Sequence, residues 1–263
     1  MTIRLITAGV GIPGLLIVLW LGTPAVGAVA LVAAGVGGWE LAGMARGRAA
    51  RPYRWLMVAW PAAFVASGWL VAENEAEWWL LWSVAAVGAA PAFAMLGTGH
   101  RSAFLYAIAA GPYVGITLAH APILRSTGDG GSWLLLALLV TFAADSAAMF
   151  TGLAIGRHRL APRISPGKTW EGTTGGLVAG GVAAMTLAAV FDLEIAVGWA
   201  VVLGVVMAMA GTLGDLGESA FKRNAGVKDS GILIPGHGGI LDRLDSLMPN
   251  LVIVYWVSEW SAN

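Results

Sequence analysis

Charged side chains gather in one segment of an otherwise apolar chain, and their types suit metal and phosphate chemistry. Residues 214–245 hold nine charged side chains, in a chain that has 15 Lys and Arg and 15 Asp and Glu in total. Carboxylates stand at both ends, with Asp215 and Glu218 spaced i, i+3 and Asp242 and Asp245 spaced in the same way. On a helix this spacing puts both carboxylates of a pair on one face. Carboxylate oxygens are hard ligands, so Asp215, Asp242 and Asp245 suit Mg²⁺ better than a soft metal.

Cations and glycines in the same region favour a phosphate ligand. Arg can bind phosphate bidentately and Lys binds it as a point charge; the cations are Lys168, Lys222, Arg223, Lys228 and Arg243. Glycines 236, 238 and 239 let the backbone approach a ligand and can offer N–H groups to phosphate oxygens. His237 lies between them and either acts as an acid or base or hydrogen-bonds a phosphate. These residue types predict phosphoryl or nucleotidyl transfer, and no G-x-x-x-x-G-K-[ST] sequence occurs, which excludes a P-loop.

The composition places this chemistry in a membrane protein. The chain has 263 residues, of which 58% are hydrophobic and 11% are charged, and its mean hydropathy is +0.77. Soluble domains carry roughly 25% charged residues. There are no cysteines, so disulfides and thiolate metal sites are excluded. Residues 1–22 could be a signal peptide, but the apolar run is long and further spans follow, so we interpret it as a first span.

The apolar runs predict an all-α polytopic integral membrane protein with about nine transmembrane helices, because the runs are near ~20 residues long rather than ~10. We divide the chain into N-terminal transmembrane helices at 1–132, for scaffold and lipid contact, and a catalytic region at 133–263 with cytoplasmic loops 157–171 and 214–245. The predicted spans are 3–22, 24–45, 55–72, 78–97, 102–121, 133–156, 172–191, 195–213 and 246–262.

The distribution of charge predicts an orientation. If the chain crosses nine times, 14 of the 15 Lys and Arg fall on one side and Arg125 alone falls on the other. The positive-inside rule then places the N-terminus and both long loops in the cytoplasm. We therefore expect a multi-pass protein of the cell inner membrane whose active site faces the cytoplasm. The opposite side is acidic, with Glu73, Glu75, Glu77, Asp129, Asp192, Glu194 and Glu259.

Two carboxylates fall inside predicted spans. Asp145 lies in the span 133–156, where a carboxylate costs at least ~2.5–3.5 kcal/mol, so it should face a cavity or a partner. The alternative is a structural hydrogen bond between helices. Glu40, near the end of the span 24–45, is more simply a residue close to the membrane interface.

A longer pattern resembles a known family. The residues Ser219-x-x-Lys222-Arg223-x-x-x-x-Lys228-Asp229-x-Gly231-x-x-Ile234-Pro235-x-His237-Gly238-Gly239-x-x-Asp242-Arg243-x-Asp245 are similar to the signature of phosphatidate cytidylyltransferases, also called CDP-diacylglycerol synthases, over 27 residues. GDLGES at 214–219 agrees, and ISPGKTWEG at 164–172 is similar to the family's SPKKTWEG, with Gly167 in place of one lysine. Around Asp145, Ala144 and Met149 stand where the family typically has Asn and Tyr.

The resemblance implies transfer of CMP from CTP to phosphatidate, giving CDP-diacylglycerol and pyrophosphate in phospholipid biosynthesis. It implies Mg²⁺ held by Asp215 and Asp242, and a second metal ion, since the family is associated with a two-metal centre on the equivalent aspartates. Asp245 is then either a ligand or an orienter of Arg243. The implied catalytic residues are Asp215, Lys222, Arg223, His237, Asp242, Arg243 and Asp245, and the implied substrate-binding residues are Asp145, Ser165, Lys168, Ser219, Lys228, Asp229, Gly238 and Gly239.

The expected partners are CTP, phosphatidate and a second copy of the chain, with no nucleic acid. The cation pattern alone fits a nucleotidyltransferase or kinase acting on another lipid phosphate or a polyprenol equally well. A transporter would also contain buried carboxylates and Gly-rich helices, but it should show internal repeats with broken helices in matching places. We find no such repeat in the sequence.

Overall fold

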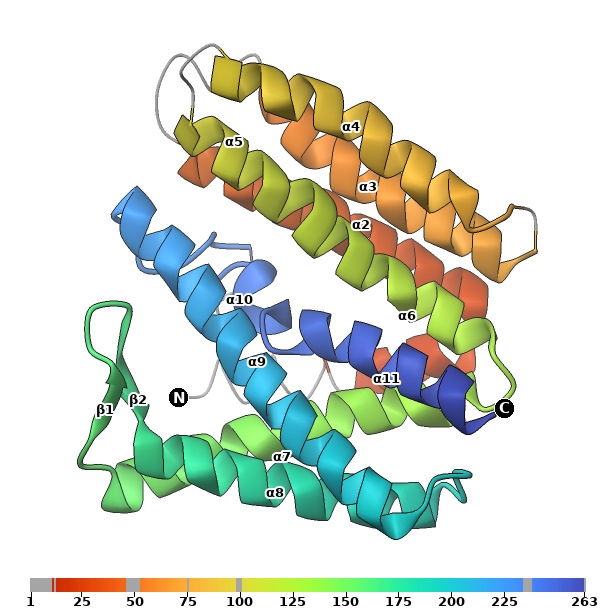
Figure 1. Cartoon of the computed structure of the whole chain (residues 1–263), viewed down its shortest axis with the longest axis vertical. Helices are drawn as coiled ribbons and strands as arrows, with labels where there is room; N and C mark the ends of the chain where they lie inside the picture. Colours follow the sequence, from red (N-terminus) through yellow and green to blue (C-terminus); the bar gives the residue numbers. More distant parts are fainter. Residues whose placement is uncertain are drawn as a thin grey trace. The chain divides into compact units, whose positions relative to one another are not determined.

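The computed structural model describes residues 11, 13–45, 53–74, 76–97, 101–233 and 238–262. It divides the chain into two compact units, each built almost entirely of helices (Figure 1). Unit 1 comprises Met1–Gly128 and Asn224–Arg243, and unit 2 comprises Asp129–Arg223 and Leu244–Asn263. By its contacts the segment 224–243 groups with the N-terminal helices, and the functional division at residue 132 stays a prediction.

Unit 1 is a helical bundle. It contains α2 (Thr23–Met44), α3 (Arg54–Ala72), α4 (Trp79–Gly97) and a continuous helical path of α5 (Arg101–Ile108), the π-helical η2 (Ala109–Ile116) and α6 (Thr117–Ser126). Small residues allow the backbones to approach: a Cβ at Gly38 would meet the Met57 carbonyl, and one at Gly68 would meet the Ala119 carbonyl. Close helix approach through small residues is the usual packing mode in membranes, where burial from water does not drive association.

Unit 2 is built on a pair of antiparallel helices. α7 (Gly130–Ile155) packs along α8 (Trp170–Val190), and the two are joined by a hairpin of β1 (Arg159–Ala161) and β2 (Ser165–Thr169) (Figure 1). α9 (Val197–Ala225) and α11 (Leu247–Ser261) complete the unit. The Asn250 Nδ2 on α11 donates a hydrogen bond of 2.8 Å to the Thr141 Oγ1 on α7, which satisfies a polar pair inside the apolar bundle. The short α10 (Leu241–Leu244) lies at the junction of the two units along the chain.

The helices support the predicted membrane class. Among the described residues, six helical segments are long and apolar enough to cross a bilayer: Thr23–Met44, Arg54–Ala72, Ala103–Ser126, Gly130–Ile155, Trp170–Val190 and Val197–Ala225. They correspond to six of the predicted spans, and the chain is a predominantly α-helical, polytopic membrane protein. The predicted span 78–97 corresponds to a shorter apolar helix, and 246–262 corresponds to α11, which has 15 residues. Much of 3–22 lies outside the described residues, so the total of nine stays a prediction.

The two predicted cytoplasmic loops are more ordered than expected. Residues 214–225, which we assigned to a loop, continue α9. Asp215, Ser219 and Lys222 are spaced four and three residues apart, so the helix itself places them on one face. Loop 157–171 contains the β-hairpin, which the all-α prediction did not include. Asp242 lies in α10, and Asp245 is the residue that directly follows the last residue of this helix.

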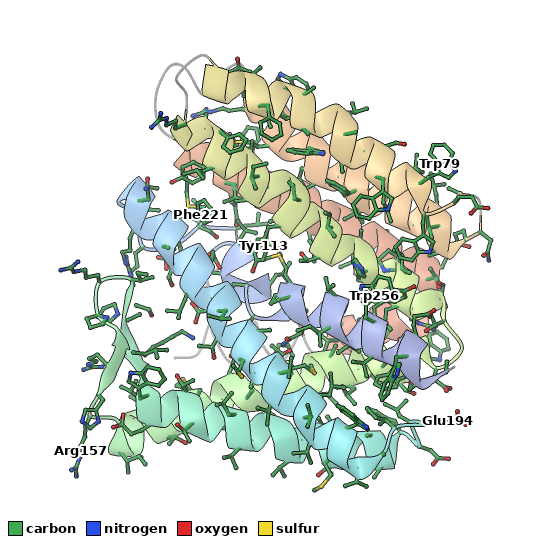
Figure 2. The ribbon with its side chains drawn as sticks, in the orientation of Figure 1. Trp79, Tyr113, Arg157, Glu194, Phe221 and Trp256 are labelled. Atoms are coloured by element: carbon green, nitrogen blue, oxygen red, sulfur yellow. The ribbon has the colours of Figure 1, made fainter. Side chains whose placement is uncertain are left out.

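Charge separates along unit 2 as the sequence predicted. Arg157 and Glu194 lie at opposite ends of the α7–α8 pair (Figure 2). A helix with the 21 residues of α8 is about 31 Å long, close to the thickness of the bilayer core. The basic residues of the hairpin therefore belong to one end of the pair, and Asp192 and Glu194 belong to the other.

The contact between α8 and α9 gives a stability prediction. A Cβ at Gly204 would collide with the Gly180 carbonyl and lie 2.7 Å from the Ala184 Cβ. Gly204→Ala should therefore destabilise unit 2 by about 1–3 kcal/mol, the usual cost of overpacking. The matched control is Gly198→Ala on the same helix, where a Cβ meets nothing within 4 Å. Thermal unfolding in detergent should show a lower Tm for Gly204→Ala and no decrease for Gly198→Ala; equal Tm values would contradict the packing.

Candidate active site

Unit 2 holds an aspartate–lysine cluster formed by Asp145, Lys168, Asp215, Ser219 and Asp245. The Lys168 Nζ lies 2.7 Å from the Asp215 Oδ2, and the Ser219 Oγ donates to the Asp215 Oδ1 at 3.3 Å. About 31% of the Asp215 side chain is exposed, so the carboxylate remains accessible to a ligand. Asp145 on α7 faces the Ser246 side chain and has Lys168 and Asp215 as charged neighbours. The cluster thus brings together five predicted site residues from distant parts of the sequence.

The hairpin positions Lys168, and Glu171 fixes the base of the hairpin. The Glu171 carboxylate accepts hydrogen bonds from the backbone N–H of Arg157 at 3.1 Å and of His158 at 3.2 Å. It also lies 2.6 Å from the His158 Nδ1. Thr169 caps α8, since its Oγ1 accepts from the Gly172 N–H at 3.1 Å. Arg223 reaches the same hairpin, where its Nε donates to the Ile164 carbonyl at 3.2 Å.

Asp245 lies in a charged environment that favours its protonated form. Burial and, to a smaller extent, the negative charge of Asp215 raise its pKa to about 6, although hydrogen bonds to Glu218 and to the Ser246 backbone and the charge of Lys222 act in the opposite direction. Two carboxylates that disfavour each other's charge form a place where an added cation is stabilising. Lys222, which we expected to bind phosphate, lies 3.1 Å from the Glu218 carboxylate one turn away on α9.

Unit 1 holds a second cluster, which we call the Glu40–loop cluster: Glu40, Ser230, Gly239 and Asp242. The Asp242 Oδ2 accepts from the Ser230 N–H at 2.9 Å, the Ser230 Oγ at 3.0 Å and the Gly239 N–H at 2.8 Å. Glu40, from α2, accepts from the Ile240 N–H at 2.8 Å, the Leu241 N–H at 3.1 Å and the Ser230 Oγ at 2.7 Å. Three successive backbone N–H groups, 239 to 241, are therefore bound by the protein's own carboxylates.

The Gly239 N–H has a different partner from the one that we predicted. We expected the Gly239 N–H to face a phosphate oxygen, but in this structure it donates to Asp242. Gly238 has a φ of +86°, a left-handed conformation that side chains rarely adopt, and a Cβ there would lie 2.5 Å from the Asp242 Oδ2. Both glycines thus let the backbone close around a carboxylate. Gly236 and His237 lie outside the described residues.

Most of the remaining predicted residues are at the surface of their units. Lys228, Asp229 and Arg243 are exposed, as is Arg223. Ser165 begins β2 and is half-buried opposite Ala161 in the hairpin. A Cβ at Gly238 would lie 3.5 Å from that of Asp229, so this aspartate borders the loop around Asp242. Three cations of the signature, Arg223, Lys228 and Arg243, are therefore placed where an incoming anion could reach them, whereas Lys222 is buried beside Glu218.

Comparison with known proteins identifies the family. The sequence profile described as the Cytidylyltransferase family matches residues 2–260. The chain belongs to the Cytidylyltransferase family.

Relatives within this family carry one activity name. A phosphatidate cytidylyltransferase of Staphylococcus saprophyticus is 44% identical over 136 residues, which cover 52% of this chain and 52% of that protein. Proteins of the same name from Haemophilus influenzae and Brucella suis are 48% identical over 124 residues and 41% identical over 150 residues. These two matches cover 43% and 54% of this chain, and 41% and 53% of the respective relatives. The chain thus matches about half the length of the curated relatives.

The donor chemistry of this cytidylyltransferase-family chain fits Mg²⁺ at Asp215. Its carboxylate is partly exposed and has a second carboxylate, Asp245, in its electrostatic environment. Within the described ranges, no group of three or more His, Cys, Asp and Glu side chains is arranged to hold a metal ion by itself. Mg²⁺ commonly takes one or two carboxylates and completes its shell with substrate phosphates and water, so the two findings are compatible. Asp242 fits less directly, because its Oδ2 already accepts three hydrogen bonds.

Sequence reasoning missed Glu40. We interpreted it as a residue near the membrane interface, whereas its side chain is 7% exposed and bound to the signature loop. The available signal was a carboxylate in an otherwise uncharged helix, which requires a polar partner. The sequence does not reveal that partner, because it lies about 200 residues further along the chain.

The hairpin base gives a second prediction. Glu171→Ala removes the acceptor for the Arg157 and His158 N–H groups, so these amides should exchange with deuterium several-fold faster as the hairpin opens locally. The control is Glu194→Ala at the other end of the α7–α8 pair (Figure 2). Peptide-resolved hydrogen exchange over residues 157–169 measures the effect. Unchanged exchange in Glu171→Ala would show that the strands hold the hairpin without this carboxylate.

Proposed function

We propose that this chain transfers CMP from CTP to phosphatidate, giving CDP-diacylglycerol and pyrophosphate. The observation that carries the proposal is the match of the whole signature from Ser219 to Asp245 in a chain whose family relatives are named phosphatidate cytidylyltransferases. In this reaction an oxygen of the lipid phosphate attacks the α-phosphorus of CTP. The bond between the α- and β-phosphates breaks, and pyrophosphate leaves with the electron pair.

The chemical difficulty of this reaction suits the residues present. A phosphate monoester is already an anion, so a strong general base is not required, and the main cost is to bring two polyanions together. Catalysis should then depend on positioning and on charge neutralisation. We assign phosphate binding to Lys168, Lys222, Arg223, Lys228 and Arg243, with His237 and the remaining signature residues bordering the same ligands.

We assign the metal to Asp215 and Asp242, as the family signature implies. Mg²⁺ at such a site would supply positive charge to offset the charge that develops on the pyrophosphate. The Lys168 Nζ, which lies 2.7 Å from the Asp215 Oδ2, balances the charge of this carboxylate in the structure. Binding of a metal–nucleotide complex would give each of these groups a new partner of opposite charge, the carboxylate gaining a cation and the lysine gaining a phosphate. From the same resemblance we also propose a second metal ion and a homodimer.

We place the basic end of unit 2 in the cytoplasm of the cell, at the inner membrane. Arg157, Arg159, Arg163 and Lys168 belong to the hairpin end, and the opposite end carries Asp192 and Glu194 (Figure 2). The positive-inside rule supports this orientation. CTP is an aqueous polyanion, so a site at this end would meet it at the membrane surface, next to the phosphate of its lipid co-substrate.

A direct assay tests the function. Purified protein with radiolabelled CTP, Mg²⁺ and phosphatidate should form a labelled lipid and release pyrophosphate. EDTA should stop the reaction, and added Mg²⁺ should restore it, because neutralising two polyanions needs the divalent cation. A panel of other lipid phosphates and polyprenols serves as the comparison. Transfer to one of those substrates but not to phosphatidate would overturn the proposed substrate, and uptake of CTP into vesicles without turnover would favour a transporter.

Asp215→Asn tests the metal assignment. The amide keeps the size of the side chain and removes its charge, so CMP transfer should fall by about 10²-fold or more, as it does when electrostatic stabilisation is lost. The Tm should change little, because the side chain is partly exposed. Asp192→Asn, an exposed carboxylate outside the cluster, is the matched control. Transfer at near-normal rates by Asp215→Asn would refute the metal role. This variant is cleaner than Asp242→Asn, which also disturbs three hydrogen bonds of the loop.

A further inference from the structure

Glu40 is a buried carboxylate on an apolar helix. It is the one charged residue of α2, which is described along its whole length, and its side chain is 7% exposed. A buried carboxylate is strongly unfavourable unless hydrogen bonds replace the water it has lost. The groups that compensate Glu40 therefore indicate which part of the fold it stabilises.

Among the described residues, the hydrogen-bond donors to the Glu40 carboxylate all come from the signature segment. Its Oε1 accepts from the Ile240 N–H at 2.8 Å, and its Oε2 accepts from the Leu241 N–H at 3.1 Å and from the Ser230 Oγ at 2.7 Å. These donors lie 190 to 201 residues away along the chain. Each bond to a charged acceptor is stronger than one between neutral groups. The carboxylate thus ties together the two stretches of signature that flank residues 231–239.

Two glycines of the signature are needed for this approach. A Cβ at Gly231 would lie 2.6 Å from the Glu40 Oε1, and a Cβ at Gly239 would collide with both carboxylate oxygens. Real side chains essentially never come so close, so the helix or the loop would have to move. The requirement for glycine at these two positions therefore follows from Glu40 itself and needs no contact with a substrate.

Glu40 is coupled to Asp242 through one hydroxyl. The Ser230 Oγ lies 2.7 Å from the Glu40 Oε2 and 3.0 Å from the Asp242 Oδ2. A hydroxyl has one proton to donate, so it serves one carboxylate at a time, and backbone N–H groups supply the remaining bonds. Gly239 donates to Asp242, while Ile240 and Leu241 donate to Glu40. The position of the Asp242 carboxylate therefore depends on where Glu40 holds the loop.

We propose that Glu40 is a positioning residue for the transfer reaction, which from helix α2 holds Ser230 and residues 239–242, and with them the carboxylate of Asp242, in place. The expected effect of Glu40 on kcat rests on the proposed function, whereas its expected effect on deuterium exchange in the segment it binds does not. The inference gives the N-terminal helices a role beyond scaffold and lipid contact.

Glu40→Gln is the primary test. An amide has one oxygen and one NH₂, so in either orientation it places a donor against the Ile240 or the Leu241 N–H. Deuterium exchange over residues 238–244 should become about tenfold faster or more, as expected for loss of a bond to a charged acceptor. The kcat per folded enzyme should fall by about tenfold or more, because small displacements of reacting groups are costly. Glu73→Gln, an exposed carboxylate of unit 1 bound to the Trp69 Nε1, is the matched control.

A second variant leaves Glu40 unchanged. Gly231→Ala pushes the carboxylate away from the loop and should reproduce both effects, whereas Gly43→Ala on α2, where a Cβ meets nothing within 4 Å, should reproduce neither. This pair decides the question if Glu40→Gln does not fold. A purely structural role would lower the Tm and the folded fraction but leave the kcat of the folded enzyme at the control value, which would overturn the proposal.

The outcomes separate the two proposals. If the wild-type protein does not transfer CMP to phosphatidate, the proposed function fails, and the exchange measurement still tests whether Glu40 holds the loop. If the wild-type protein is active, and Glu40→Gln and Gly231→Ala match their controls in both exchange and kcat, the positioning role fails and the function stands.

Discussion

Every charged group placed inside this apolar chain must find a compensating partner, and that constraint organises both polar clusters. An ionised side chain without water or a counter-charge is too costly to keep in a folded membrane protein. Glu40 is compensated by backbone N–H groups and a hydroxyl, Asp215 by Lys168, and Glu218 by Lys222. These pairings bind a helix to a loop, a hairpin to a helix, and one helical turn to the next, so the buried charges determine how the functional segments are held.

The same constraint separates two uses of glycine. In the helices, Gly38, Gly68, Gly180 and Gly204 allow backbones to pack closely, as small residues do in membranes. In the signature, Gly231 and Gly239 make room for a carboxylate and Gly238 adopts a left-handed backbone. A glycine-rich loop beside cations is readily interpreted as a phosphate cradle. Here the N–H groups of 239 to 241 already have anionic partners within the protein, Asp242 and Glu40.

The aspartate–lysine cluster consists of residues that the family resemblance predicted to lie in the site. Its residues come from α7, the β-hairpin, α9 and the turn before α11, and all belong to unit 2. The hairpin brings Lys168 to Asp215 because its base is fixed by Glu171 and its last residue caps α8. A carboxylate whose neighbours include both a lysine and another carboxylate can exchange one cationic partner for another. This property suits a site that binds a polyanion together with its cation.

The sequence by itself determined the class of the protein, the spacing of its apolar helices, the asymmetry of its charges and the family, because these depend on composition and on residues close in the chain. It also placed Asp145 and Asp215 among the residues of interest. The tertiary structure decided that residues 214–225 are helical and that Asp245 lies beyond α10. It alone decided the partners of Glu40, because these lie 190 to 201 residues away in sequence and are selected by the folding of helix and loop together. A charge in an apolar run reveals that a partner must exist, but only packing in three dimensions reveals which one.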